Sequence, residues 1–345
     1  MNSLPLQHTV IKEIIRESET INTYRLCSAG GAPLAPIRAG HFLCAMLEIG
    51  PVHTSRPYSI CSSPALAGKG EYQISVEDFE GSFAARYIHE NWRVGTPVDV
   101  TAPHGDYVYD KERDTPHIVC IAGGSGVTPF LSLARAVDDG LEDVEITLLF
   151  GNGCWADVPF KEELARLESA GRLRVVHVLS DEVREGCEHG FIGRELIKRY
   201  ARDDGPRSVW ICGPGPMYDF VDGELAALGI PERLIRHAPY APPKDPSVDP
   251  AYRGDVHAVY ELTVRGGGDE HKIPARADET LLVAMERAGL KASCACRSGE
   301  CGECRVRLLG GEVYIPERGM AQREGDLIPA CYSYPLGDGV IEQMI

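Results

Sequence analysis

The densest group of reactive side chains in this chain lies near its C-terminus, in CACRSGECGEC (residues 294–304). Cys296, Cys301 and Cys304 have the spacing C-x-x-x-x-C-x-x-C, and Cys331 follows after 26 intervening residues. Thiolates in a glycine-rich loop can hold iron–sulfur clusters or zinc, or form a redox-active dithiol. A zinc site usually shows paired C-x-x-C units, and this loop has one. The local sequence does not match a thioredoxin-type dithiol, and ordinary buried cysteines do not explain four at these spacings.

The spacing resembles that of plant-type ferredoxins, in which four thiolates hold a [2Fe–2S] cluster. The resemblance covers residues 258–345 and implies four iron ligands, namely Cys296, Cys301, Cys304 and Cys331. Gly299 and Gly302 let the loop wrap the cluster closely, because they carry no side chain. Cys294 is surplus to the ligand set and is interpreted as a packed thiol.

Composition and charge limit the function classes. The chain has 345 residues, of which 43% are hydrophobic and 25% charged, as in a globular protein of two or three domains. Its formal net charge of −16 argues against nucleic acid as a partner. No apolar run approaches the roughly 18 residues of a membrane span, and the N-terminus resembles no secretion signal. Seven cysteines are scattered singly, which predicts reduced thiols and a cytoplasmic location.

Three segments with different patterns must position these residues. Residues 1–111 hold short alternating runs separated by turns, which predict an antiparallel β-barrel. Residues 112–239 alternate buried strands with amphipathic helices, the pattern of an α/β domain with a parallel sheet. A proline-rich stretch at 240–257 is interpreted as a linker. Residues 258–345 form the third domain, which by its resemblance to ferredoxins is an α+β (β-grasp) domain.

Two glycine-containing turns stand about ninety residues apart in the second segment. IAGGSGVTPF follows an apolar strand and opens a helix, so its glycines can admit a phosphate. VWICGPGPM ends another strand, at the edge where α/β sheets bind ligands. The pair resembles the NAD(P) domain of the ferredoxin–NADP reductase superfamily. The resemblance implies a pyrophosphate site at Gly123, Gly124, Gly126 and Thr128, and a nicotinamide site bordered by Cys212, Gly213, Pro214 and Met217, with Cys212 catalytic.

The barrel contains SRPYSICSSP, which matches the flavin signature Arg-x-Tyr-Ser of the same superfamily. The resemblance implies a flavin held by Arg56, Pro57, Tyr58 and Ser59, with Ser59 catalytic. Arginine suits a flavin phosphate, tyrosine can stack on the ring, and a serine hydroxyl can reach its polar edge. Gly81 and Ser82 are expected at the helix N-terminus that faces the flavin phosphates. The family usually has Ser or Thr where this chain has Ala85, and Ser82 is the candidate substitute.

The domain order resembles reductases of the phthalate dioxygenase and phenylacetyl-CoA epoxidase type. It implies an NADH-dependent oxidoreductase in which FAD, or alternatively FMN, splits an electron pair for the [2Fe–2S] cluster. The partner would be an oxygenase component or another redox protein. Two alternatives stay open: the electron-transfer subunit of an anaerobic enzyme resembling dihydroorotate dehydrogenase, and a redox-sensing subunit without turnover.

The strand RVVHVLS bears on the choice between NADH and NADPH. Asp181 and Glu182 follow Ser180, and Gly153 follows the FGN segment. Carboxylates would repel the 2′-phosphate of NADPH, whereas an acidic side chain can accept hydrogen bonds from the free ribose hydroxyl of NADH. Asp181 is therefore predicted to favour NADH.

Overall fold

The computed structural model describes residues 5–200, 206–239, 242–317 and 323–344. By its internal contacts the chain divides into two compact units. The larger comprises Gln7–Leu43 and Tyr58–Ala238, and the smaller comprises the described parts of Met1–Leu6, Cys44–Pro57 and Pro239–Ile345. The expected domain boundaries and the linker at 240–257 stay a prediction, and residues 240 and 241 of that linker lie outside the described residues.

The strands of the first hundred residues form an antiparallel sheet in the order β4-β3-β6-β1-β2-β5, as far as the structure describes them. In β1, Thr9 and Ile11 are buried and Val10 between them is half-buried, which is the two-residue period expected of a strand with one covered face. The elements are β1 (Leu6–Arg16), β2 (Ile21–Ser28), β3 (Phe42–Ile49), β4 (Val52–Ser59), α1 (Pro64–Ala67), β5 (Glu71–Glu77), α2 (Phe83–Asn91) and β6 (Pro97–Thr101).

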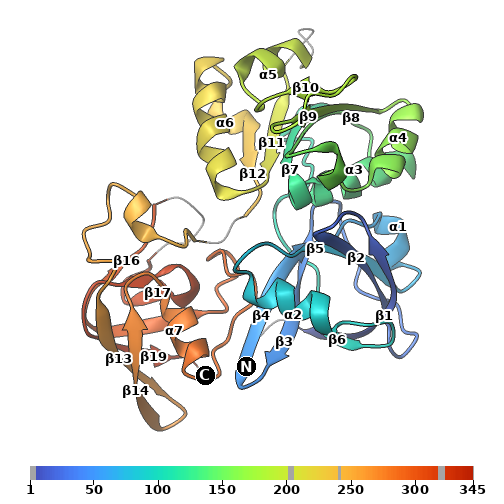
Figure 1. The fold of residues 1–345 in the computed structure, drawn as a ribbon. Coiled ribbons are helices and arrows are strands. Elements are labelled where there is room, and N and C mark those ends of the chain that lie inside the picture. Colours follow the sequence, from blue (N-terminus) through green and yellow to red (C-terminus); the bar gives the residue numbers. More distant parts are fainter. Residues whose placement is uncertain (1–4, 201–205, 240–241, 318–322, 345) are drawn as a thin grey trace. The chain divides into compact units, whose positions relative to one another are not determined.

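A parallel sheet follows in the larger unit, in the order β10-β9-β8-β7-β11-β12 over the described residues. Figure 1 shows α3 and α4 beside one face of this sheet and α5 and α6 beside the other. The elements are β7 (His117–Gly123), η1 (Gly124–Val127), α3 (Thr128–Asp138), β8 (Glu145–Asn152), η2 (Trp155–Asp157), α4 (Lys161–Ser169), β9 (Leu173–Leu179), β10 (Glu188–His189), α5 (Arg194–Tyr200), β11 (Ser208–Cys212), α6 (Gly215–Ala227), η3 (Glu232–Leu234) and β12 (Ile235–His237).

Helix coverage of both faces accounts for the continuous apolar runs. Ile118, Val119, Cys120 and Ile121 of β7 are all fully buried, although consecutive strand residues point to opposite faces. On α3, Arg135 donates two hydrogen bonds to Glu163 on α4, at 2.9 and 2.7 Å. These observations confirm the predicted α/β segment and its helices.

The C-terminal segment forms a mixed sheet in the order β14-β13-β19-β15-β17 within its described residues. β13 pairs antiparallel with β14 and parallel with β19, and α7 packs against β14, which confirms the expected β-grasp arrangement. Its core includes Leu262, Val264, Met285 and Ile341. The elements are η4 (Pro246–Val248), β13 (Val259–Gly266), β14 (Asp269–Arg276), α7 (Leu281–Arg287), β15 (Arg305–Gly310), β16 (Val313–Tyr314), β17 (Leu327–Pro329), η5 (Ala330–Tyr332), β18 (Tyr334–Pro335) and β19 (Gly339–Gln343).

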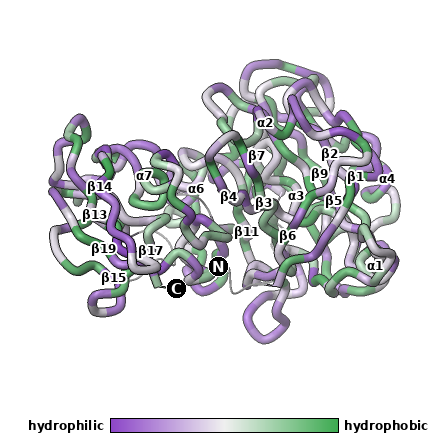
Figure 2. The backbone as a smooth tube through the Cα atoms, turned by 90° about the horizontal axis from the view of Figure 1, so that it is seen from below, coloured by the Kyte–Doolittle hydropathy of each residue, from purple (hydrophilic) through white to green (hydrophobic). Residues whose placement is uncertain are grey.

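Hydropathy follows this architecture. Figure 2 shows hydrophobic residues along the strands and hydrophilic residues at many of the outer turns. None of the helices in the described ranges is both long and apolar enough to cross a membrane.

Candidate functional site: two cysteine pairs, a flavin-type strand and a nucleotide turn

The four predicted iron ligands lie in two pairs in the third segment. Cys296 and Cys301 lie in the loop between α7 and β15, while Cys304 immediately precedes β15 and Cys331 lies in η5. The backbone N–H groups of Cys301 and Ser298 donate to the Cys296 sulfur at 3.4 and 3.5 Å. The N–H of Cys331 donates to the Cys304 sulfur at 3.5 Å. Amides aimed at sulfur are what a loop needs to stabilise thiolate ligands.

Each pair is close enough for one thiol to stabilise the thiolate of the other. A hydrogen bond from Cys301 lowers the pKa of Cys296, and one from Cys331 lowers the pKa of Cys304. The pKa values of Cys301 and Cys331 are raised correspondingly by their partners. No three His, Cys, Asp or Glu side chains of the described chain are placed to hold one metal ion. A [2Fe–2S] cluster needs instead two cysteines for each of its two irons. The two cysteine pairs therefore fit this cluster.

The cluster loop has the backbone freedom that this wrapping needs. Gly299 and Gly302 have φ values of 80° and 73°, in the left-handed region that glycine adopts without strain. Arg297 also has a positive φ, of 57°, and is held there by its side chain. Cys294 is buried, and burial raises its pKa to about 12, as expected for a packed thiol.

A buried network joins the cluster loop to the beginning of β4 within the smaller unit. Arg297 donates to both carboxylate oxygens of Glu286 on α7, at 2.7 and 2.9 Å. The hydroxyl of Thr54 donates to the same carboxylate at 2.7 Å. The hydroxyl of Ser55 donates to the carbonyl oxygen of Ala295 at 3.1 Å. The cluster loop is thus held by side chains that sequence spacing did not reveal.

The flavin-type signature lies on the second half of β4. Because side chains alternate along a strand, Arg56 and Tyr58 share one face and Pro57 and Ser59 the other. All four are half-buried, so they can contact a ligand. Arg56 donates to the hydroxyl of Thr54 and, at 2.7 Å, to the carbonyl oxygen of Ser55.

The turn before α2 has the expected form with one difference. Gly81 has φ of 76°, and Ser82 occupies the N-cap position. The Ser82 hydroxyl makes no capping hydrogen bond and donates instead to Asp78 at 2.6 Å. Hydrogen bonds from Ser82 and Arg86 lower the pKa of the Asp78 carboxyl. The Ser82 side chain therefore does not cap the first-turn N–H groups of α2. Its hydroxyl is bound to Asp78 and does not point to a phosphate-binding role in this structure.

In the larger unit, the glycine turn after β7 packs directly against the Cys-Gly-Pro turn after β11. The two strands are parallel neighbours, with Ala122 opposite Cys212. A Cβ on Gly126 would lie 2.2 Å from the carbonyl oxygen of Cys212, and a Cβ on Gly213 would lie 3.1 Å from the backbone nitrogen of Gly123. Larger residues would force these turns apart, which explains the glycines. The structure thus brings together the two motifs that the sequence separates by about ninety residues.

The remaining residues of these turns lie close by. Gly124 has φ of 53°, and the Thr128 hydroxyl donates to the carbonyl oxygen of Ser125 at 2.9 Å at the start of α3. Pro214 is the N-cap residue of α6, and both it and Met217 lie about 3 Å from where a Cβ on Gly123 would be. Their positions fit a nucleotide that crosses the carboxyl ends of β7 and β11.

The thiol of Cys212 is neutral in this setting. It lies at the end of β11, and burial raises its pKa to about 12. A catalytic contribution from this side chain would therefore come from a protonated thiol and its shape, not from a thiolate.

Acidic side chains gather where β8 and β9 end. The backbone N–H of Asp181 donates to the carbonyl oxygen of Gly153 at 2.9 Å. A Cβ on Gly153 would lie 3.1 Å from a carboxylate oxygen of Asp181 and 3.2 Å from one of Asp157. The two positions singled out in the sequence, after Ser180 and after the FGN segment, are therefore neighbours.

A cation that sequence reasoning missed lies at the same corner. Glu182 accepts a hydrogen bond from the N–H of Trp155 at 2.7 Å and forms an ion pair with Arg184 at 3.5 Å. The Arg184 guanidinium lies 4.7 Å from the centre of the Trp155 ring. This corner has more carboxylates than cations, but it does contain an arginine. The position of Arg184, four residues after Ser180, is the sequence feature from which it could have been predicted.

A further residue missed from the sequence is Glu77, at the end of β5. Its carboxylate accepts a hydrogen bond from the N–H of Ser125 in the glycine turn, at 3.2 Å. The sequence carries no signal for this contact, because the two residues are 48 positions apart and belong to different predicted segments.

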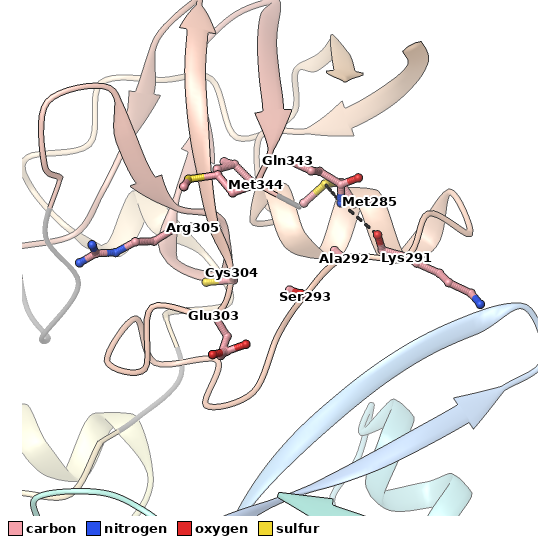
Figure 3. Close-up of a pocket in the computed structure, with 10 residues that line it drawn as sticks. Met285, Lys291, Ala292, Ser293, Glu303, Cys304, Arg305, Gln343 and Met344 are labelled. Atoms are coloured by element: carbon pink, nitrogen blue, oxygen red, sulfur yellow. Dashed lines mark hydrogen bonds between the residues drawn. The ribbon is translucent and has the colours of Figure 1, made fainter. Parts of the chain in front are cut away.

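A small pocket lies beside the cluster ligand Cys304 (Figure 3). Its volume is about 90 Å³, and Gln343 on one side donates to the carbonyl oxygen of Lys291 at 3.0 Å. Ligand sites for drug-sized molecules begin at roughly 300 Å³. This pocket is therefore too small for a flavin or a dinucleotide.

Comparison with known proteins agrees with the geometry. Residues 120–223 match the family model for an oxidoreductase NAD-binding domain, and residues 264–336 match that for a 2Fe-2S iron-sulfur cluster binding domain. The chain is 28% identical to one of the subunits of 1,2-phenylacetyl-CoA epoxidase from Escherichia coli (strain K12), over 94% of each chain. It is 31% identical to the 3-ketosteroid-9-alpha-monooxygenase, ferredoxin reductase component, of Mycobacterium tuberculosis, over 83% of this chain and 79% of the relative.

The solved structure of phthalate dioxygenase reductase has the same fold over the full length. The TM-score is 0.69 at 22% identity, and the alignment covers 99% of this chain and 98% of the other. The epoxidase subunit and phthalate dioxygenase reductase both align with this chain over more than nine-tenths of its length. The chain belongs to the ferredoxin–NADP reductase superfamily, in the branch whose reductases carry a C-terminal plant-type [2Fe–2S] ferredoxin domain.

Proposed function

We propose that this chain is the reductase component of an oxygenase system, which oxidises NADH and passes electrons to a separate protein. The observation that carries the proposal is the presence, in one chain, of a nucleotide-type double turn at Gly126 and Cys212 and two amide-supported cysteine pairs. The relatives supply the partner class, since two of them are named as parts of an epoxidase and a monooxygenase. An oxygenase component of this kind is therefore the proposed acceptor. The singly placed free cysteines support a cytoplasmic location.

Each group of proposed binding residues has a role that follows from its chemistry. Bound flavin would exchange an electron pair with NADH and single electrons with the iron–sulfur centre. Arg56 would bind a flavin phosphate, Tyr58 would pack on the flavin ring, and Ser59 would hydrogen-bond its polar edge. On the nucleotide side, the N–H groups of the glycine turn would hold the pyrophosphate and Cys212 would border the nicotinamide.

The proposed binding set is that read from the sequence. It comprises Arg56, Pro57, Tyr58, Ser59, Gly81 and Ser82 for the flavin, Gly123, Gly124, Gly126, Thr128, Asp181, Cys212, Gly213, Pro214 and Met217 for NADH, and Cys296, Cys301, Cys304 and Cys331 for the cluster.

The test is to separate the two redox functions by mutation. The purified protein should contain about two iron atoms and one flavin per chain, and NADH should bleach the flavin absorbance rapidly. Cys301→Ser should lose the iron but keep this bleaching, since Cys301 belongs to the smaller unit, whereas the nucleotide turns and most of the proposed flavin residues (Tyr58, Ser59, Gly81 and Ser82) belong to the larger. Cys27→Ser, a half-buried cysteine of β2, is the matched control and should keep both.

Absence of flavin bleaching by NADH in the intact protein would refute the proposal and favour a redox-sensing subunit without turnover. The flavin is expected to be FAD, and chromatography of the acid-released cofactor distinguishes it from FMN. The acceptor is identified by adding candidate oxygenase components and measuring NADH oxidation coupled to product formation.

A further inference from the structure

A carboxylate lies on the turn that is proposed to bind the nucleotide diphosphate. Glu77 ends β5, and one of its oxygens accepts the N–H of Ser125 at 3.2 Å. A Cβ on Gly124 would lie 3.3 and 3.5 Å from its two oxygens. The carboxylate thus packs closely against the glycine turn, and the missing side chain of Gly124 makes room for it.

The charge of Glu77 has no side-chain counter-ion in the described part of the chain. The neighbouring Asp78, by contrast, receives hydrogen bonds from Ser82 and from Arg86, the latter as an ion pair at 2.8 Å. Glu77 is half-buried, so water screens it incompletely. Its stabilising contact is the turn's own N–H, a donor of the kind that a phosphate oxygen would use.

A dinucleotide diphosphate carries about two negative charges and would use the same turn. If it takes the Ser125 N–H, the Glu77 carboxylate loses its hydrogen bond; if it does not, the phosphates bind beside an uncompensated negative charge. Either arrangement weakens binding through the charge of one side chain.

We propose that Glu77 is an internal competitor for the diphosphate position and limits the affinity of the nucleotide site. This inference rests on the proposed function, since it takes the glycine turn to be the diphosphate site. In the absence of nucleotide, the carboxylate holds the turn in its binding conformation. When a dinucleotide is bound, oxidised or reduced, the same charge favours its release.

The test compares the dissociation constant of NAD⁺ for the flavin-loaded wild-type protein, Glu77→Gln and Glu195→Gln by calorimetry. Glutamine keeps the size of Glu77 and removes its charge. Glu195 is an exposed residue of α5, so Glu195→Gln makes the same change in net charge on the same unit. Glu77→Gln should bind NAD⁺ about tenfold more tightly than wild type at low ionic strength, and the gain should shrink with added salt. Glu195→Gln should stay within about twofold of wild type.

Two further measurements make the result specific. Adenosine, which lacks the diphosphate, should bind wild type and Glu77→Gln with the same dissociation constant. Glu77→Ala should repeat the gain in NAD⁺ affinity, which guards against a new contact made by glutamine.

Equal or weaker NAD⁺ binding by both Glu77 variants, with normal flavin content, would overturn the inference and indicate that Glu77 supports the nucleotide. If neither wild type nor any variant binds NAD⁺, the proposed function itself fails, and the inference fails with it. The two failures are distinguishable because the first leaves nucleotide binding intact.

Discussion

The ion pair of Glu286 and Arg297 should be the most sensitive point of the iron–sulfur segment. Its side chains are 7% and 12% exposed, and the guanidinium binds both carboxylate oxygens. Thr54 completes the hydrogen bonding of the carboxylate. Because Arg297 directly follows the predicted ligand Cys296, displacement of its side chain would move the cluster loop.

Glu286→Gln removes one charge and leaves the other buried. Loss of one partner of a buried ion pair typically lowers the free energy of unfolding by about 3–5 kcal/mol, because the remaining charge is neither paired nor hydrated. If the free energy of unfolding falls by about 2 kcal/mol per molar urea, the urea concentration at the unfolding midpoint of this segment should fall by about 1.5–2.5 M. Because the two side chains interact directly, the double variant Glu286→Met/Arg297→Met should lose less stability than either single variant, since it leaves no isolated buried charge.

The assay is urea titration of the iron-loaded full chain, followed by loss of the visible absorbance of the cluster under anaerobic conditions. Glu270→Gln is the control, because it breaks the Arg265–Glu270 pair of the β13–β14 hairpin, whose side chains are 50% and 48% exposed. Exposed pairs contribute little, so its midpoint should move by less than about 0.5 M. A Glu286→Gln midpoint no lower than that of Glu270→Gln would show that the buried network does not hold the loop.

Other predictions concern the larger unit. Catalytic efficiency with NADH should exceed that with NADPH by at least about tenfold, and Asp181→Arg should narrow the ratio, since it replaces a repelling carboxylate at the corner beside Gly153; equal efficiencies in the wild type would contradict this. Burial raises the pKa of Cys212 to about 12, so iodoacetamide should modify it at about pH 8 far more slowly than free cysteine, as followed by mass spectrometry. The hydrogen bond from Arg135 lowers the pKa of Glu163 below its usual 4.5, so this pair stabilises the fold above that pH and loses its effect as the pH falls through the folded-state pKa. Glu163→Gln should cost about 1 kcal/mol at neutral pH, and thermal unfolding should show that difference closing in acid; a constant difference down to about pH 4 and below would count against the ion pair.

The sequence by itself determined the chemistry that depends on local spacing. Cys296, Cys301 and Cys304 lie in one short loop, so their spacing limits which metal centre they can hold. Likewise, the apolar run of β7 and the glycines after it predict a buried parallel strand and a ligand-binding turn, because strand burial and backbone freedom are local properties.

The tertiary structure decided which of these local features meet. It placed Gly126 against Cys212, paired Cys304 with Cys331, and brought Glu77 onto the turn at Ser125. It also formed the buried pair of Glu286 and Arg297. Such contacts depend on packing between segments far apart in the chain, and hydrophobic periodicity records only that a side chain is buried, not which residue it contacts. Charge compensation in particular became visible only in the folded chain. Among the described residues, some carboxylates have a cation beside them, whereas Glu77 has a backbone amide and no side-chain cation.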